Sequence, residues 1–275
     1  MPFICDAHVH FYSCFKLEKC FEKANENLNS LLRAHGLPEN TTKLLCLTER
    51  FDCDYFTLLS KEPDTLKNEN IKIEKTNDEF ALKVTLKDGQ SVYLIAGRQI
   101  VTQEKVELLA LCMNEKIADG LSLAQTIKDV SKHKGILVLN WAPGKWMFRR
   151  KSLVSKLINE HTNSTLALGD TTLRPNIWCE PLLMRKGSKK GLSIIAGSDP
   201  LPLENEFLLI GSYCLLYDGP FDETLAAESF KRIILGDFKK PRRVGKRSSL
   251  LGVIKRLLAH RNVGKLHKES GLLRK

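Results

Sequence analysis

Short apolar runs alternate with helical stretches along most of the chain. Strand-like apolar runs lie at residues 2–5, 43–47, 106–112, 136–139, 165–168 and 192–196. Apolar residues at helical spacing predict helices over residues 17–34, 122–133, 150–160, 177–185 and 222–235. Repeated strand and helix units predict an α/β fold with a mainly parallel sheet, either closed or open.

One segment departs from this alternation. Residues 71–73, 80–86 and 91–95 alternate polar and apolar side chains, and Asp88-Gly89 stands between the last two runs. An Asp-Gly pair between alternating runs is typical of a β-hairpin. We therefore expect an antiparallel insertion over about residues 70–96.

The positive charge is concentrated at the C-terminal end. The chain has 43 Lys and Arg against 32 Asp and Glu; residues 238–275 hold 13 of these cations and one acid, which leaves 30 against 31 elsewhere. We therefore divide the chain into a main domain, residues 1–237, and a basic, partly helical tail, residues 238–275. The tail has apolar residues at helical spacing, namely Leu250, Leu251, Ile254, Leu257 and Leu258.

A cationic helix of this kind has two interpretations. It can contact an anionic membrane surface or the phosphates of a nucleic acid. Alternatively, it packs on its own domain and ends in a solvated basic segment. The tail sequence does not distinguish these alternatives.

No apolar run approaches the ~20 residues that a membrane-spanning helix needs. The N-terminal residues show no basic region followed by an apolar run and a small-residue cleavage site. The 8 cysteines lack Cys-x-x-Cys spacing, and several lie in apolar runs, as reduced thiols commonly do. These features predict a cytoplasmic protein with free thiols, which the tail can bring to a membrane as a peripheral protein.

Polar clusters follow six of the apolar runs. In parallel α/β folds the carboxyl ends of the strands meet on one face, where loops form the active site. The clusters are Asp6-Ala-His8-Val-His10, Thr48-Glu49-Arg50, Gly97-Arg98-Gln99, residues 140–146, Gly169-Asp170 with Arg174, and Gly197-Ser198-Asp199. We expect them to converge on one site.

The first cluster predicts a metal site. In an extended segment alternate residues face the same way, so Asp6, His8 and His10 present a carboxylate and two imidazoles together. These are suitable ligands for Zn²⁺, Mn²⁺ or Fe²⁺. The remaining histidines fall in helices or in the tail and are interpreted as surface residues: His35, His133, His161, His260 and His267.

Several of these motifs resemble those of one superfamily. Ile-Cys-Asp-Ala-His-Val-His-Phe at residues 4–11 resembles the first-strand motif of amidohydrolases and of the polymerase and histidinol phosphatase (PHP) superfamily, and Ile-Ala-Gly-Ser-Asp at residues 195–199 resembles its closing motif. Residues 45–50, 95–102 and 136–144 resemble intermediate PHP motifs in order and approximate spacing. The resemblance, closest to a divergent bacterial branch, covers residues 3 to about 215. It implies a distorted (β/α)7-8 TIM-like barrel of PHP type and metal-dependent hydrolysis, often of phosphate esters.

The departures from the PHP pattern reduce the expected number of metals. Arg50 and Leu201 stand where histidines are usual, Gln99 stands where a glutamate is usual, and Trp141 falls near another usual histidine. The resemblance then implies a site for one or at most two divalent ions. Its expected ligands are Asp6, His8, His10 and Asp199.

Basic residues share the expected strand-end face. Clustered guanidinium groups favour phosphate or carboxylate, so the sequence predicts a small anionic substrate, with phosphorylated compounds as the main class. We expect Asp170 or Glu49 to act as general base and Lys145, with Arg174, to neutralise charge on the phosphoryl oxygens. The expected substrate-binding residues are Arg50, Arg98, Gln99, Trp146, Arg149 and Arg174.

Three functions remain open at the level of sequence. The first is a metal-dependent hydrolase, a phosphoesterase in particular. The second is a catalytically silent PHP-like barrel that binds an anionic ligand and uses the tail to reach a membrane or nucleic acid. It would follow if Arg50 and Arg174 formed buried ion pairs with Glu49 and Asp170. The third is a nucleic-acid-processing protein in which the tail and the site act together.

Overall fold

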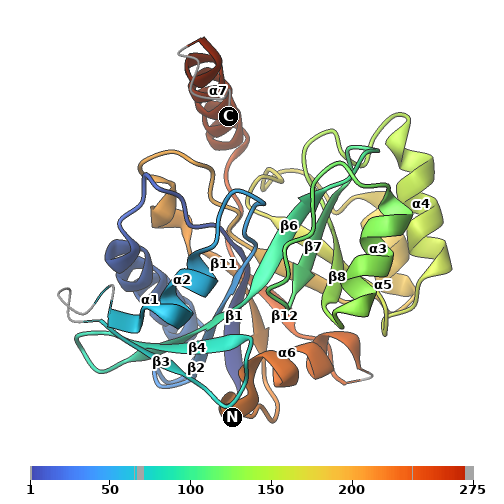
Figure 1. Cartoon of the computed structure of the whole chain (residues 1–275). Helices are drawn as coiled ribbons and strands as arrows, with labels where there is room; N and C mark the ends of the chain where they lie inside the picture. The colour runs from blue at the N-terminus through green and yellow to red at the C-terminus, as the bar shows by residue number, and fades with distance from the viewer. Residues whose placement is uncertain (1, 65, 67–70, 237, 270–275) are drawn as a thin grey trace.

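The chain folds around two β-sheets (Figure 1). The computed structural model describes residues 2–64, 66, 71–236 and 238–269, with side chains described as far as residue 262. The first sheet has seven strands, in the spatial order β12 (Arg242–Gly245), β11 (Tyr213–Tyr217), β1 (Phe3–Val9), β2 (Thr42–Leu47), β5 (Ser91–Ile95), β4 (Ala81–Thr85) and β3 (Lys72–Lys75). The second has five, in the order β10 (Ile194–Gly197), β9 (Ala167–Thr171), β8 (Ile136–Asn140), β7 (Glu107–Leu111) and β6 (Gly97–Val101).

Parallel and antiparallel pairings are mixed in both sheets. The parallel pairs are β1 with β2, β2 with β5, β8 with β9 and β9 with β10. Strands β6, β7 and β8 pair antiparallel, as do β3, β4 and β5, and β11 lies antiparallel to both β1 and β12. The hairpin over about residues 70–96 is therefore confirmed, whereas the prediction of a mainly parallel sheet holds for only part of the molecule.

The α-helices are α1 (Leu17–Ala34), α2 (Tyr55–Lys61), α3 (Leu123–Lys132), α4 (Arg150–Glu160), α5 (Leu182–Lys189), α6 (Ala226–Leu235) and α7 (Leu250–Glu269). Two 3-10 helices, η2 (Glu206–Leu209) and η3 (Glu223–Leu225), precede β11 and α6. Ser122 caps α3 as predicted, because its hydroxyl accepts a hydrogen bond from Gln125 N at 3.2 Å. The helix predicted over residues 177–185 is shorter and begins after Pro181, which has an extended backbone.

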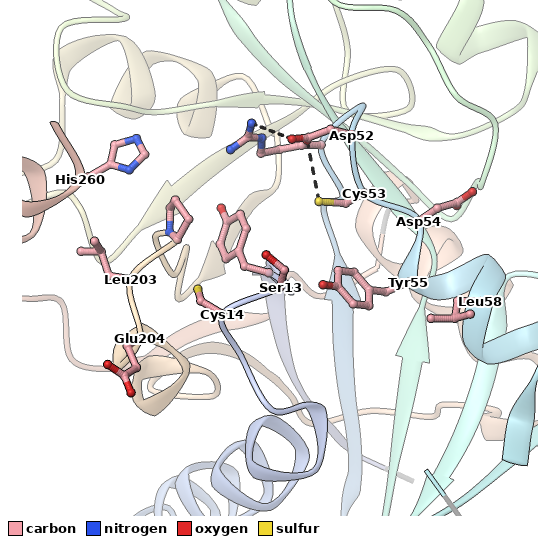
Figure 2. A pocket seen from close by; sticks show the side chains of 13 residues that line it. Ser13, Cys14, Asp52, Cys53, Asp54, Tyr55, Leu58, Leu203, Glu204 and His260 are labelled. Carbon is pink, nitrogen blue, oxygen red and sulfur yellow. Dashed lines mark hydrogen bonds and ion pairs between the residues drawn. The ribbon is translucent and has the colours of Figure 1, made fainter. Parts of the chain in front are cut away.

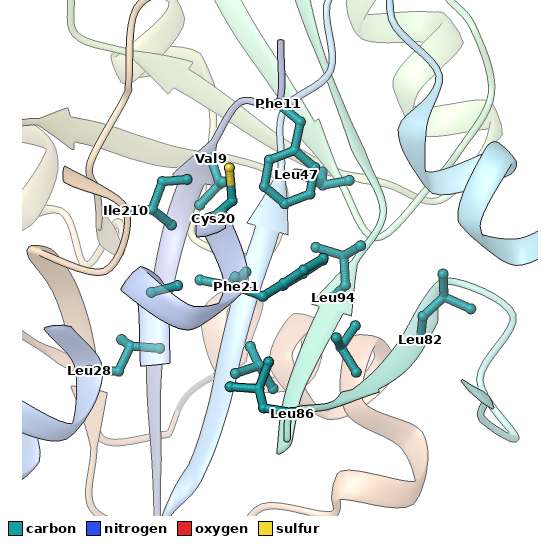
Figure 3. Close-up of a cluster of buried hydrophobic side chains, with 14 of the residues drawn as sticks. Val9, Phe11, Cys20, Phe21, Leu28, Leu47, Leu82, Leu86, Leu94 and Ile210 are labelled. Carbon is teal, nitrogen blue, oxygen red and sulfur yellow. The ribbon is translucent and has the colours of Figure 1, made fainter. Parts of the chain in front are cut away.

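Three apolar clusters hold these layers together. The first lies between α1 and one face of the first sheet, and Figure 3 shows Phe21 and Leu28 of α1 against Val9, Leu47 and Leu94. The second fills the space between the two sheets, and the third packs the outer face of the second sheet against α3, α4 and α5. Complete burial of an aliphatic or phenylalanine side chain contributes about 1.5–3 kcal/mol. The apolar side chains that recur at helical spacing in α1 therefore form the face of the helix that packs into the core.

The two sheets meet along two seams. At one seam Asp199 N donates to His8 O at 2.9 Å, and at the other Glu49 N donates to Gly97 O at 3.0 Å. Glycine permits both approaches, because a Cβ at Gly197 would lie 2.2 Å from His8 Cβ, and one at Gly97 would lie 2.4 Å from Leu47 O. Strands thus surround the central cluster as in a barrel, but in the described part of the chain they form two separate sheets. The closed (β/α)7-8 barrel is not confirmed.

The basic tail packs on the domain in its first part, and the far end of α7 extends away from the domain (Figure 1). Strand β12 pairs with β11, and α7 contacts the domain through Val253 and Arg256, which are both buried. Leu251, Ile254 and Leu258 of the predicted apolar face are exposed instead. The tail therefore contains the expected helix, and it contacts the domain through a side other than the apolar face. In the described residues no helix combines the length and the hydrophobicity that crossing a membrane would require.

Candidate metal centre

His8, His10 and Asp199 come together at the seam between the two sheets. His8 lies in β1 and His10 follows that strand, whereas Asp199 follows β10 in the other sheet. Gly197 allows β10 to approach the backbone of His8, and this close contact brings Asp199 to the imidazoles. All three residues are buried, and their prediction from the polar clusters agrees with the geometry.

The three donor atoms have the spacing of a metal site. His8 Nε2 lies 3.0 Å from His10 Nε2, and Asp199 Oδ1 lies 3.5 Å from the first and 3.7 Å from the second. Metal–ligand bonds of about 2.0–2.1 Å in a tetrahedral arrangement place neighbouring ligand atoms roughly 3.3 Å apart. These residues therefore fit a divalent ion with two nitrogen ligands and one oxygen ligand.

The backbone of Asp199 adopts a left-handed conformation with φ +50°. A non-glycine residue is uncommon in this region and needs support from its surroundings, although aspartate tolerates it better than most residues do. The amide of Asp199 donates to His8 O, which fixes one side of the residue. In the described part of the chain no lysine or arginine forms an ion pair with its carboxylate, so this acceptor faces the imidazoles alone.

Burial and neighbouring charge favour neutral imidazole at this site. Burial lowers the pKa of His10 well below its usual value, and the adjacent His8 lowers it further. Gln99 Oε1 approaches His8 Nε2 at 3.3 Å, and Thr48 Oγ1 lies 3.5 Å from His10 Nε2. His8 Nδ1 is buried without a hydrogen-bond partner among the described residues, so no second acceptor fixes the ring through that nitrogen.

Glu107 is a functional candidate that the sequence analysis missed. It is the first residue of β7, and it accepts a hydrogen bond from Asn140 Nδ2 at the end of β8. Burial raises the pKa of Glu107, and the negative charge of Asp199 raises it further. A carboxylate beside the candidate metal ligands with a raised pKa is suited to accept a proton.

Asp6 lies next to this group but is directed elsewhere. Its Oδ1 accepts from Ser198 N at 2.8 Å and from His8 N at 3.2 Å, and its Oδ2 accepts from Gly211 N at 2.7 Å. Burial raises the pKa of Asp6 to about 6 against these hydrogen bonds, which lower it. The structure thus places the Asp6 carboxylate among backbone amides, outside the cluster formed by the two imidazoles and Asp199.

Asp170 and Arg174 form a buried ion pair. Arg174 Nε donates to Oδ1 at 2.7 Å and Arg174 Nη2 to Oδ2 at 2.6 Å, while Tyr213 and Arg243 donate to Oδ2 at 2.8 and 2.9 Å. Although burial acts in the opposite direction, these bonds lower the pKa of Asp170. Both oxygens of the carboxylate already accept hydrogen bonds, so Asp170 has little capacity to act as the predicted general base.

Glu49 and Arg98 are engaged in a similar way. Glu49 accepts from the amides of Tyr55 and Phe56 at the start of α2, and its Oε2 lies 3.6 Å from Arg98 Nη1. Arg98 also donates to Asn114 O at 2.9 Å and to the carboxylate of Asp54 at 2.8 Å. Burial raises the pKa of Glu49 while Arg98 lowers it. Glu49 therefore pairs with Arg98, and Arg50 pairs with the exposed Asp52 instead.

The other predicted substrate-binding residues lie in different environments. Gln99 and Arg50 line a cavity beside the candidate metal centre. Lys145 is half-buried, and its charge lowers the pKa of Glu107. Arg149 is exposed at the start of α4. Trp146 is buried in the third apolar cluster and donates its indole N–H to Asn140 O at 2.9 Å, so it closes the core rather than walling the cavity.

One cavity adjoins the candidate metal centre, and a larger cavity shares part of its wall. The smaller has a volume of about 330 Å³ and is lined by His10, Asp199, Glu107 and Gln99. The larger, of about 920 Å³, is shown in Figure 2. Both are lined by Tyr12, Arg50, Pro202 and His260. His260 was interpreted as a surface residue, but α7 places it at both cavities.

No protein-family model and no curated protein sequence matches the chain. Solved structures do match its fold. PsfC from Pseudomonas syringae PB-5123 is 15% identical with a TM-score of 0.55, over 95% of this chain and 99% of that protein. The lesion-specific endonuclease PfuEndoQ from Pyrococcus furiosus is 13% identical with a TM-score of 0.53, over 89% of this chain.

A third likeness is to Endonuclease Q in a complex with a 27-mer duplex substrate that has an abasic lesion at the active site. It is 13% identical with a TM-score of 0.50, over 94% of this chain and 72% of that one. This chain spans 59% of the length of PfuEndoQ. At these identities the likenesses show a shared fold.

Proposed function

We propose that the chain is a metal-dependent hydrolase of PHP-like type that cleaves phosphate esters. One observation carries this proposal: His8, His10 and Asp199 converge from two sheets with ligand spacing and without an arginine or lysine partner among the described residues. The endonucleases named above share the fold and act on a phosphodiester substrate, which supports the same class of chemistry.

The residues around the site have different roles in the proposed hydrolysis. A divalent ion held by His8, His10 and Asp199 would supply Lewis acidity, which lowers the pKa of a bound water from ~15.7 towards ~7. Glu107 accepts the proton from the attacking water, because its half-buried carboxylate has a raised pKa and lines the same cavity as His10 and Asp199. Arg50 reaches the cavity and binds phosphoryl oxygens. Asp170 and Glu49 position the surrounding loops through their ion pairs.

The catalytically silent alternative has one observation in its favour. It requires the cations and carboxylates of the strand-end face to neutralise one another, and the pairs Asp170–Arg174 and Glu49–Arg98 do so. It does not account for Asp199, whose carboxylate has no such partner among the described residues. Metal binding by that carboxylate therefore separates the two functions.

The test is metal titration of the metal-free, untagged full chain with Zn²⁺, Mn²⁺ and Fe²⁺, followed by assays on phosphomonoesters and phosphodiesters. We expect one tight site in the parent, and its loss together with activity in the variant H8A/H10A. His35→Ala serves as the control because His35 is exposed in the segment after α1. Equal metal affinity in the parent and in H8A/H10A, or no hydrolysis of any ester by the loaded parent, would reject the hydrolase.

A further inference from the structure

Arg256 in α7 is buried against the loop that carries Asp199. Its guanidinium donates to Asp199 O at 2.9 Å and to Thr172 Oγ1 at 2.8 Å. It also donates to the Glu206 carboxylate through Nε, at 2.8 and 2.9 Å, and through Nη2 at 2.6 Å. A residue of the basic tail is thereby bonded directly to the backbone of a candidate metal ligand.

The partners of Arg256 are themselves tied to the same loop. Thr172 donates its hydroxyl to Ser198 O, the residue before Asp199. Glu206 Oε2 accepts from Leu201 N at 2.9 Å, two residues after Asp199. Arg256 therefore holds the loop before, at and after Asp199, whose left-handed backbone needs such support. The planar guanidinium spreads five donors over three nitrogens, whereas a lysine ammonium has three donors on a single nitrogen, so lysine can make only some of these bonds.

One helical turn beyond Arg256 lies His260. Residues four apart lie on the same face of a helix, so the buried side of α7 continues from Arg256 to this imidazole. His260 lines both cavities, and Figure 2 shows it above Leu203 at the edge of the larger one. Its Nδ1 is buried without a hydrogen-bond partner in the described part of the chain. An unpartnered ring nitrogen at a cavity wall can bond to a ligand in that cavity.

We propose that α7 completes the active site: Arg256 is a positioning residue that holds Asp199 in its metal-binding geometry, and His260 contacts the phosphate group of the substrate. This inference rests on the hydrolase proposed above. It assigns the tail a role inside the site, in place of separate binding to a membrane or nucleic acid. If α7 only stabilised the fold, its removal from the site would not alter the affinity for metal or phosphate. Those two affinities therefore decide the proposal.

Arg256 is tested with the full chain and metal alone. By calorimetric titration with Zn²⁺ or Mn²⁺, we expect R256A to bind metal at least tenfold more weakly and Arg256→Lys to recover only part of that loss. Lys255→Ala, an exposed neighbour on the same helix, should stay within twofold of the parent. A folded R256A with parental metal affinity overturns the positioning role. If R256A does not fold, Glu206→Gln replaces it, with a loss of about threefold expected and parental affinity overturning the role.

A second measurement on Arg256 does not depend on metal. Amide hydrogen exchange of the metal-free protein should become at least fivefold faster in residues 198–206 of R256A or E206Q, and should not change in Lys255→Ala. Unchanged exchange there overturns the positioning role whether or not metal binds. A parent that binds no metal but shows the exchange difference rejects the hydrolase and leaves Arg256 as the residue that orders this loop.

His260 is tested with inorganic phosphate as the probe. His260→Ala should keep the parental metal affinity within twofold, because His260 is outside the ligand cluster. The metal-loaded variant should bind phosphate at least fivefold more weakly than the loaded parent, with His35→Ala as the control. Equal phosphate affinity in the two proteins, or no phosphate binding by the loaded parent, overturns the assignment of His260.

Discussion

Two buried carboxylates at the same end of the second sheet have opposite surroundings. Asp170, in β9, is bonded to Arg174, Arg243 and Tyr213. Asp199, after the neighbouring β10, faces two imidazoles and no lysine or arginine ion-pair partner among the described residues. Asp170 thus has both of its carboxylate oxygens engaged by donors, whereas Asp199 has no cationic partner among the described residues, so the partners rather than the residue type separate the structural carboxylate from the candidate metal ligand.

The difference is also one of charge. Buried ion pairs are costly to break, because removing one partner leaves an uncompensated charge in the interior. Asp170 therefore contributes to stability more than to chemistry. Asp199 lies near the half-buried Glu107 and raises its pKa, and a bound cation would offset the repulsion between these two carboxylates.

The largest expected effect is on stability when the saturated carboxylate is removed. Asp170→Asn leaves Arg174 and Arg243 without their shared counter-charge, so we expect the free energy of unfolding to fall by about 3–5 kcal/mol. Urea denaturation measures this loss. Asp52→Asn, which removes the exposed partner of Arg50, should cost less than about 1 kcal/mol. A cost for Asp170→Asn as small as that of the control would contradict the distinction.

The second prediction concerns the seam that creates the open site. In Gly197→Ala the new Cβ would lie 2.2 Å from His8 Cβ, so β10 must move away from β1. We expect a loss of about 1–3 kcal/mol, the usual cost of overpacking, together with weaker metal binding. Gly252→Ala in α7 is the control, because its nearest neighbour would be Ser249 Oγ at 3.2 Å. Parental metal affinity in Gly197→Ala would show that the close approach is not required.

The third prediction isolates the open carboxylate. Asp199→Asn removes a charge that has no cationic partner among the described residues, so the unfolding free energy should change by less than about 1 kcal/mol. Metal affinity should fall about 10- to 100-fold, because the neutral amide is a poorer ligand than carboxylate. Calorimetry and urea denaturation on the same preparation measure both quantities. A large loss of stability with unchanged metal affinity would reverse the assignments of Asp170 and Asp199.

The smallest expected effect is a pH dependence. The pKa of Asp170 is lowered in the folded protein, so its contribution is fully present above the unfolded value of about 3.9 and is lost as pH falls through the folded value. The stability difference between the parent and Asp170→Asn should therefore shrink below about pH 4. Urea denaturation between pH 3 and 7 follows it. A difference that grows on acidification would contradict the lowered pKa.

The sequence predicted much of the fold and the centre of the site. The α1 periodicity, the Ser122 cap and the hairpin turn at Asp88-Gly89 are local signals, and each is confirmed because local geometry decides it. The alternation of His8 and His10 and the Gly-Ser-Asp cluster likewise identified the residues that converge. The two imidazoles follow from alternation along an extended strand and the convergence from the gathering of strand ends, whereas Asp199 as a ligand was implied by the motif resemblance.

The remaining site residues depend on topology that the sequence does not display. Glu107 begins β7 instead of following it, and it reaches the site because β7 runs antiparallel to β8. A search limited to residues after strands cannot find it. The pairing of Glu49 with Arg98, in place of Arg50, follows from the contact between the two sheets. The role of α7 was hidden because Arg256 lies off the predicted apolar face and its partner, Glu206, lies 50 residues earlier.

The candidate ligands are divided between the sheets, with His8 and His10 on one and Asp199 on the other. An ion bound there would link the two sheets across a boundary that is otherwise held by apolar packing, backbone hydrogen bonds and side-chain bonds such as those of Asp6 and Glu49. Any ligand that binds only the native state adds RT ln(1 + [L]/Kd) to stability, about 2.7 kcal/mol at a hundredfold excess over Kd. Removing the metal would then weaken the association of the two sheets and abolish hydrolysis. In a titration with a chelator, the loss of stability and the loss of activity would have the same midpoint.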